Sequence, residues 1–114
     1  MLAVIFELEP REGKVEDYLA IAQSLKAELE TIEGFISIER FESLARPGRY
    51  LSLSFWRDEA SVERWRNLSP HRAAQNRGRA EIFTDYRLRV AQVVRDYGMS
   101  AREEAPRDSQ AHHG

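Results

Sequence analysis

The sequence predicts a single α+β domain, and three observations lead to that prediction. The chain has 114 residues, a length typical of one domain that buries roughly two-thirds of its unfolded surface. Hydrophobic residues make up 42% and charged residues 32%, which is the balance of an ordinary globular protein. Four segments alternate apolar and other residues with the period of a strand, and the segments between them include two regions of helical character.

The first half of the chain contains a strand and then a long helix. Residues 2–8 form the expected strand because every second residue, from Leu2 to Leu8, is strongly apolar. Pro10 lacks a backbone donor and is expected to end this strand. Residues 14–32 predict one amphipathic helix, with apolar positions three or four apart and Gly34 placed for a left-handed C-terminal cap.

A β-hairpin is predicted next, from a strand over residues 35–44 and another over residues 50–56. Pro47 and Gly48 between them suit the central positions of a type II turn. The second of these strands has two alternating faces, one made of Leu51, Leu53 and Phe55 and the other of Ser52, Ser54 and Trp56.

The remainder predicts two short helices, a last strand and a tail. Asp58 is the expected N-cap of a helix over residues 59–67, and Ser69 and Pro70 begin a second helix that ends at Gly78. Residues 82–94 predict the fourth strand. The domain therefore spans residues 1–98, and residues 99–114 form a polar tail that buries too little to order itself, either mobile or lying on a partner subunit.

The order β-α-β-β-α-β is typical of ferredoxin-like folds, in which helices cover one face of the sheet. The predicted register leaves the other face with large apolar residues: Ile5, Ile36, Ile38, Trp56 and Val93. A patch of this kind usually marks an interface. We therefore expect a homodimer whose sheets pack face to face.

Composition argues against several functions. A net charge of −2 with mixed signs gives no electrostatic basis for binding nucleic acid. No apolar run approaches the ~20 residues of a membrane span, and the N-terminus lacks the features of a signal peptide, so a cytoplasmic protein is expected. The absence of cysteine fits a reducing compartment. His112 and His113 have no third ligand nearby in sequence, so no metal site is expected.

Four segments resemble the antibiotic biosynthesis monooxygenase domain family, the dimeric α+β barrels: AVIFELEPREGK, EGFISIERFES, LSLSFWRDEASVERWR and HRAAQNRGR. The resemblance covers residues 1 to about 98. It implies a pocket between sheet and helices in which an activated phenolate passes an electron to dioxygen without metal, flavin or other cofactor. The implied activity is a monooxygenase that acts on an aromatic or quinol-like small molecule.

The resemblance also nominates site residues. Trp65 matches the family's helix tryptophan, and His71 falls where aromatic-polyketide oxygenases carry a substrate-binding tyrosine. We expect Trp65 to form a wall and His71 to act as a base or as a hydrogen-bond partner of the substrate. An imidazole with an ordinary pKa near ~6.5 can accept a phenol proton. The expected substrate-binding residues are Phe6, Trp56, Ser61, Arg72, Gln75 and Tyr86.

Departures from the family pattern leave alternatives open. Ser61 stands where the polyketide oxygenases carry an asparagine, and Gln75 and Phe6 stand where the haem-degrading branch carries its axial histidine and an asparagine. Haem degradation is therefore disfavoured. A non-catalytic dimeric module that binds a small ligand, or acts in a stress response, is the second hypothesis. Trp65 also fits a plain core position, and His71 a solvent-exposed first helical turn.

Overall fold

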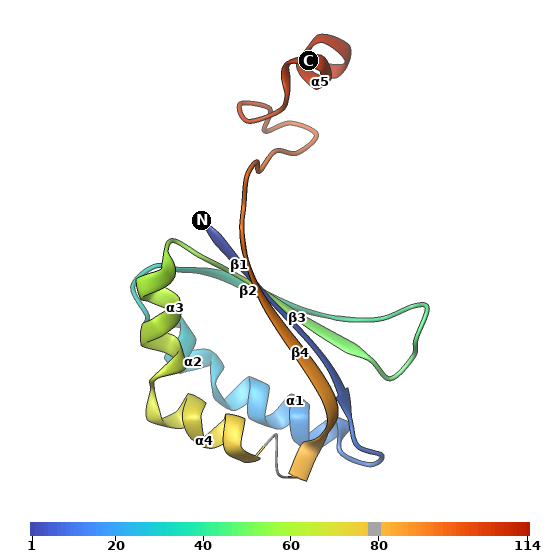
Figure 1. Ribbon diagram of the computed structural model, residues 1–114, viewed down its shortest axis with the longest axis vertical. Coiled ribbons are helices and arrows are strands. Elements are labelled where there is room, and N and C mark those ends of the chain that lie inside the picture. Colours follow the sequence, from blue (N-terminus) through green and yellow to red (C-terminus); the bar gives the residue numbers. More distant parts are fainter. Residues whose placement is uncertain (78–80) are drawn as a thin grey trace.

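A four-stranded antiparallel sheet in the order β2-β3-β1-β4 forms the centre of the protein, and helices cover one of its faces (Figure 1). The computed structural model describes residues 1–77 and 81–114; for Ser69, Pro70, His71 and Gln75 it describes the backbone alone. The strands are β1 (Leu2–Pro10), β2 (Phe35–Glu42), β3 (Tyr50–Trp56) and β4 (Phe83–Gln92). The predicted α+β fold is confirmed, with the four strands in the predicted sequence order and a helical region on either side of the hairpin.

Two helices stand where one was predicted, α1 (Val15–Ser24) and α2 (Lys26–Glu30). The interruption follows Ser24, whose hydroxyl donates to the Ile21 carbonyl at 2.7 Å. A serine that bonds back to its own helix in this way tends to bend it. The prediction of one continuous helix was therefore wrong at this point.

The second helical region agrees with the prediction, with α3 (Glu59–Arg66) capped by Asp58 and α4 (Ser69–Arg77) following after a short turn. No helix in the described part of the chain is long and apolar enough to cross a membrane. In the hairpin, Gly48 has φ +90°, as the second central position of a type II turn requires. Pro10 is the last residue of β1 and follows a register shift, where its missing N–H costs little.

The predicted assignment of sheet faces was wrong for Trp56 and Ile38. Trp56 pairs with Leu2, and Ile38 pairs with Ser54, so both lie on the face that the helices cover. A register irregularity between Phe35 and Ser37 changes the phase of β2. The helix-facing side of β3 is therefore its Ser52, Ser54 and Trp56 side.

Two buried clusters hold the helices on the sheet. Trp56, Leu29 and Val62 form one cluster at the α2 and α3 end, and Leu8, Tyr18 and Ile82 form the other at the opposite end. The larger partly buried residues pack around these two centres. Because the clusters lie at the two ends, the middle of the layer is less completely filled.

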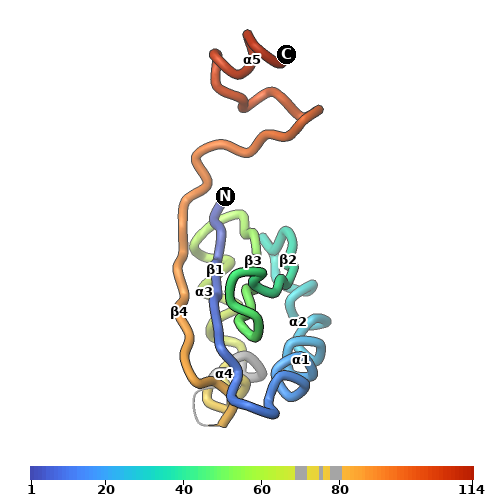
Figure 2. Tube along the Cα trace, turned by 90° about the vertical axis from the view of Figure 1, so that its right-hand side faces the viewer, coloured from blue at the N-terminus to red at the C-terminus, as the bar shows by residue number. Residues whose placement is uncertain are grey.

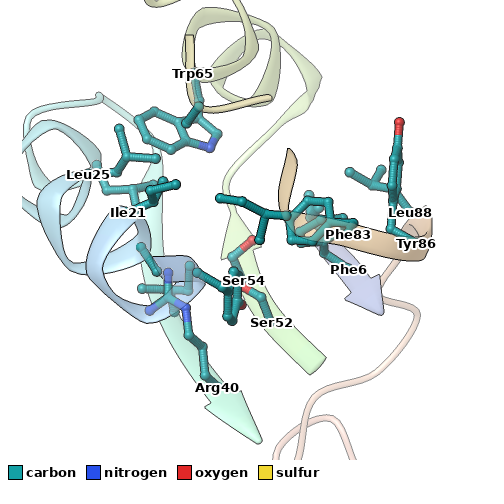
Figure 3. Close-up of a pocket in the computed structure, with 17 residues that line it drawn as sticks. Phe6, Ile21, Leu25, Arg40, Ser52, Ser54, Trp65, Phe83, Tyr86 and Leu88 are labelled. Atoms are coloured by element: carbon teal, nitrogen blue, oxygen red, sulfur yellow. The ribbon is translucent and has the colours of Figure 1, made fainter. Parts of the chain in front are cut away.

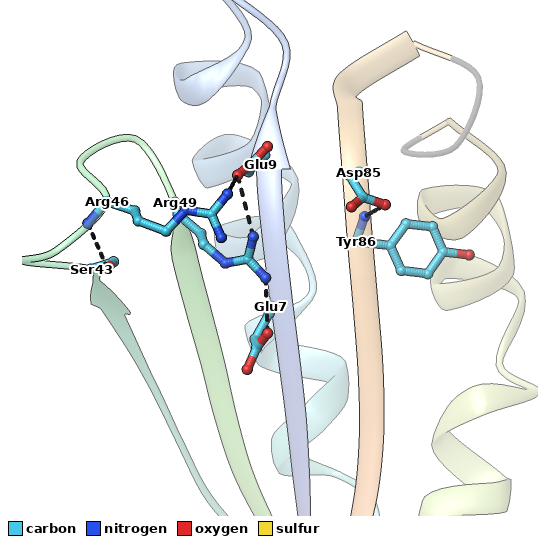
Figure 4. A network of polar contacts seen from close by, with 7 residues as sticks. All are labelled: Glu7, Glu9, Ser43, Arg46, Arg49, Asp85 and Tyr86. Atoms are coloured by element: carbon cyan, nitrogen blue, oxygen red, sulfur yellow. Dashed lines mark hydrogen bonds and ion pairs between the residues drawn. The ribbon is translucent and has the colours of Figure 1, made fainter.

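The helix-free face has an apolar centre and a charged margin. Ile5, Leu51, Leu53 and Phe55 alternate with the residues under the helices and are only half buried. Beside them, in the network of Figure 4, Arg46 and Arg49 from the hairpin contact carboxylates of β1: Arg46 to Glu9 at 2.8 Å, Arg49 to Glu9 at 3.2 Å and Arg49 to Glu7 at 2.9 Å. These bonds tie the hairpin to β1.

The C-terminal segment leaves the sheet after Val93 and rises past the N-terminus (Figures 1 and 2). It ends in the short helix α5 (Arg107–His113), so the expectation that residues 99–114 lack internal order was wrong. Arg102 supplies the order by donating to the Gly98 and Gly114 carbonyls and to Ser109. The radius of gyration is 16.5 Å, against about 13 to 14 Å for a compact chain of this length.

Replacement of Gly34 by alanine should lower the free energy of unfolding more than the same change at Gly48. Gly34 has φ +94°, and a Cβ there would stand 1.8 Å from the Ser61 hydroxyl oxygen. Gly48 has φ +90° with nothing within 4 Å, so Gly48→Ala measures the backbone cost alone, about 1–2 kcal/mol. Gly34→Ala should cost about 1–3 kcal/mol more in urea unfolding. Equal losses would show that Ser61 moves aside freely.

Candidate functional site

A cavity of about 170 Å³ lies between the sheet and the helices (Figure 3). Roughly 150 Å³ is enough to hold a benzene-sized molecule in a protein interior. Its described lining is mostly apolar, with two tyrosines, Ser52, Ser54 and Arg40 as the polar members. The cavity is therefore suited to a small, largely apolar molecule.

Most of the helical wall of the cavity comes from the α1–α2 region, and Trp65 of α3 and Ala74 of α4 complete it. Tyr18, Ile21, Ala22, Leu25 and Leu29 recur three or four residues apart, as one helix face requires, and all of them line the cavity. The same spacing predicted the helix from the sequence. The spacing could not show that these residues leave a cavity between the helix and the sheet.

Trp65 closes the cavity on the α3 side, where Figure 3 shows its indole directed toward Ile21 and Leu25. It stacks on Trp56, with ring centroids 6.4 Å apart and planes 27° from parallel. Trp56 itself is 1% exposed and does not line the cavity; its Nε1 donates to the Ser54 hydroxyl at 2.9 Å. Trp65 thus lies where the prediction placed it, whereas Trp56 supports Trp65 from behind.

Aromatic side chains line the β4 side of the cavity. Phe6 contacts Phe83 and Tyr86 in edge-to-face geometry, with centroids 5.7 and 5.6 Å apart. Tyr86 is 39% exposed, so it stands at the rim. The structure therefore brings the predicted residues Phe6 and Tyr86 together with Trp65 around one space.

Ser61 does not line the cavity. It is fully buried under Gly34, and its hydroxyl donates to Asp58 Oδ1 at 2.6 Å while its backbone N–H donates to the same oxygen at 2.9 Å. These bonds, with a further one from Arg57, lower the pKa of Asp58 to about 2. The contacts of Ser61 are those of a helix cap.

The remaining predicted residues belong to α4. Arg72 is exposed, donates to the Asn67 side-chain oxygen and does not line the cavity. The predictions for the side chains of His71 and Gln75 lie outside what the structure describes. Among the described residues, no group of three His, Cys, Asp or Glu side chains is arranged to hold a metal ion.

Sequence reasoning missed four polar residues of the cavity: Tyr18, Arg40, Ser52 and Ser54. Tyr18 was taken as part of the apolar helix stripe, which it is, but its side chain also lines the cavity. Arg40 lies two residues after Ile38 on β2, so strand alternation places it on the same face. That alternation was the available signal, and the wrong assignment of Ile38 concealed it.

The family model for antibiotic biosynthesis monooxygenases matches residues 1–77, and the chain belongs to this family. A relative from Pyricularia oryzae, named jasmonate monooxygenase ABM, is 54% identical over 94 residues, which are 82% of this chain and 44% of the relative. A Bacillus subtilis protein, the uncharacterised YqjZ, is 32% identical over 54% of this chain and 53% of its own length. The chain thus spans about half the length of the curated relatives it matches.

Solved structures share the fold at much lower identity. The Mycobacterium tuberculosis protein Rv0793 has a TM-score of 0.76 with 16% identity, covering 85% of this chain and 98% of its own. SO0527 from Shewanella oneidensis has a TM-score of 0.72 with 18% identity, covering 79% and 87%. These similarities concern the fold alone.

The Asp58 cap predicts a defined loss of stability in acid. A carboxyl group whose pKa falls from 3.8 to about 2 on folding stabilises the protein above pH 4, and this contribution disappears as the pH falls from about 4 to about 2. Asp58→Asn keeps a capping oxygen but cannot titrate. The difference in thermal stability between wild type and Asp58→Asn should shrink over that pH range, and parallel curves would contradict the assignment.

Proposed function

We propose that this chain is a monooxygenase whose substrate, a small and largely apolar molecule, binds in the cavity between the sheet and the helices. The observation that carries the proposal is the cavity itself, walled by Trp65 and a single stripe of α1 in a chain of the monooxygenase family. Phe6 and Tyr86 on the opposite side support an aromatic or ring-shaped guest, because aromatic faces and edges pack favourably on one another.

Two substrate classes follow from this proposal. They differ in whether the reaction with dioxygen needs an added reductant. An aromatic or quinol-like compound of the anthrone type supplies all four electrons: its CH₂ group becomes C=O with one oxygen atom of O₂, and the other leaves as water. Jasmonate, suggested by the name of the Pyricularia oryzae relative, is a cyclopentanone carboxylic acid. Hydroxylating one of its C–H bonds consumes two further electrons from an added reductant.

Trp65 and His71 have different roles in the proposal. Trp65 forms a wall that positions the ring of the substrate. His71 is the third residue of α4 and would accept the phenolic proton before the substrate reacts with dioxygen. The positive N-terminal end of a helix disfavours an imidazolium and so favours the neutral base.

Oxygen uptake by the purified protein tests this function. Anthrone-like phenols and hydroquinones should be consumed without a reductant, whereas jasmonate should need a reductant such as NADPH or ascorbate. His71→Ala should lower kcat by about 10²-fold or more, the usual contribution of a general base. Asn76→Ala, an exposed change on the same helix, is the matched control. An unaffected His71→Ala enzyme would remove His71 from catalysis, and no turnover of any compound would reject the function.

A second function, a non-catalytic module that binds a small ligand, is supported by the size of the cavity. About 170 Å³ falls below the ~300–1,000 Å³ of typical ligand pockets. Ligand binding without oxygen consumption would favour this function.

Membership of the antibiotic biosynthesis monooxygenase family also supports a homodimer, which we propose forms through the helix-free face of the sheet. Ile5, Leu51, Leu53 and Phe55 form an apolar centre beside the charged margin of Glu7 and its partners. An interface with an apolar core and a polar rim is the usual arrangement between subunits. The C-terminal segment, which extends beyond the domain, would lie close to the second copy.

Leu53→Glu should convert the dimer into a monomer, because it places a charge at the centre of the proposed interface. Light scattering coupled to size-exclusion chromatography measures the change in mass. Ala20→Glu, on the exposed side of α1, is the matched control and should leave the mass unchanged. A wild-type protein of monomeric mass, or a dimeric Leu53→Glu protein, would contradict this interface.

A further inference from the structure

Two buried polar groups on the cavity wall lack hydrogen-bond partners within the described residues. They are the hydroxyl of Tyr18 on α1 and the Nε of Arg40 on β2, and both residues line the cavity. Tyr18 is only 6% exposed. A third unpartnered atom, Glu28 Oε2, belongs to a residue that does not line the cavity. Buried donors are nearly always satisfied in native proteins, so these two donors require an acceptor inside the cavity, which a bound water or a ligand group would supply.

Arg40 differs from the other half-buried arginines of the described chain. Arg49 bonds to two carboxylates, and Arg102 donates to two backbone carbonyls and a serine. Arg40 has no ion pair with any described carboxylate, although it is the one charged residue in the described lining. A permanently charged guanidinium that is partly removed from water and unpaired is costly unless an anion arrives.

Tyr18 and Arg40 act on the same region of the cavity. Burial raises the pKa of the Tyr18 phenol, and the neighbouring Arg40 guanidinium opposes the rise. The phenol therefore remains a donor at neutral pH. Arg40 also makes a hydrogen-bonding contact with the Tyr18 side chain that lowers this pKa, but neither the Tyr18 hydroxyl nor Arg40 Nε has a hydrogen bond of full geometry, so both can donate to a third group. Two donors, one of them cationic, match the two oxygens of a carboxylate.

The rest of the lining defines what is attached to that carboxylate. In Figure 3, Arg40 lies on the β2 side of the cavity and Trp65 on the far side, with Ile21 and Leu25 between them. A ligand whose charged end meets Arg40 therefore places its body against apolar side chains. Ser52 and Ser54, on the strand beside Arg40, are the nearby polar members of the floor.

We propose that Tyr18 and Arg40 form a carboxylate seat, and that the cavity binds small monocarboxylic acids with an apolar body. This inference rests on the proposed function only in that the acid would be the substrate; binding itself needs no turnover. The cavity's shape alone would admit any small apolar molecule. The carboxylate seat adds a requirement that the ligand carry a negative charge.

Anaerobic binding measurements test the seat with matched acids and methyl esters: jasmonic, benzoic and octanoic acid, each with its ester. The ester keeps the apolar body and removes the charge. Quenching of tryptophan fluorescence, or calorimetry, should show at least one acid bound about 10-fold or more tightly than its ester, as expected for a hydrogen-bonded charge. Arg40→Met should abolish the preference, and Tyr18→Phe should reduce it several-fold.

Arg46→Met is the matched control, since it removes an exposed arginine that lies outside the cavity and pairs with Glu9. Its acid preference should equal that of the wild type. Circular dichroism shows whether each variant is folded. If Arg40→Met does not fold, Tyr18→Phe still tests the proposal, because it removes only a hydroxyl group. Two results would contradict the proposed carboxylate seat. In the first, the wild type binds none of the three acids more tightly than its ester. In the second, Tyr18→Phe and every folded Arg40 variant keep the wild-type preference for the acid. Oxygen uptake with neutral quinols would still report on the monooxygenase function separately.

Discussion

Burial of the Trp56 indole at the end of β3 is the constraint on which the rest of the structure depends. The side chain is 1% exposed, donates to Ser54 and packs against Phe35 from β2 and Trp65 from α3. A side chain that buries about 200 Å² contributes about 5 kcal/mol through the hydrophobic effect, a large share of the stability of a small domain. Only one of the two alternating faces of β3 can therefore turn toward the helices.

The cavity and the open apolar face both follow from that constraint. With Trp56 under the helices, Ser52 and Ser54 are carried there too, and their small side chains leave the space that larger residues would fill. The register then pairs Arg40 with Ser52 and brings a cation to the cavity floor. Leu51 and the other apolar residues of β3 are turned to the opposite side, which is the face of the proposed dimer interface.

Local patterns were enough to predict most elements because their causes are local. Asp58 caps α3 through a bond to a residue three positions later, and Gly48 adopts the positive φ that its own turn demands. The break after Ser24 and the order near Arg102 were missed because they depend on single side-chain bonds that periodicity does not report. Of the residues proposed for the site, Trp65, Phe6 and Tyr86 line one cavity, whereas Ser61 donates to the Asp58 cap of α3.

Sequence alone therefore established the order of elements, their hydrophobic stripes and the family. Alternation along β3 shows that Ser52, Ser54 and Trp56 share a face. The alternating pattern is the same for either orientation of the strand's two faces, so it does not say which face the helices cover. Three-dimensional packing resolves that choice, because the indole needs neighbours from β2 and α3 at once, and the irregularity after Phe35 shifts the phase of β2. The meeting of Tyr18 with Arg40 has the same origin: their side chains come together only when helix and strand are packed.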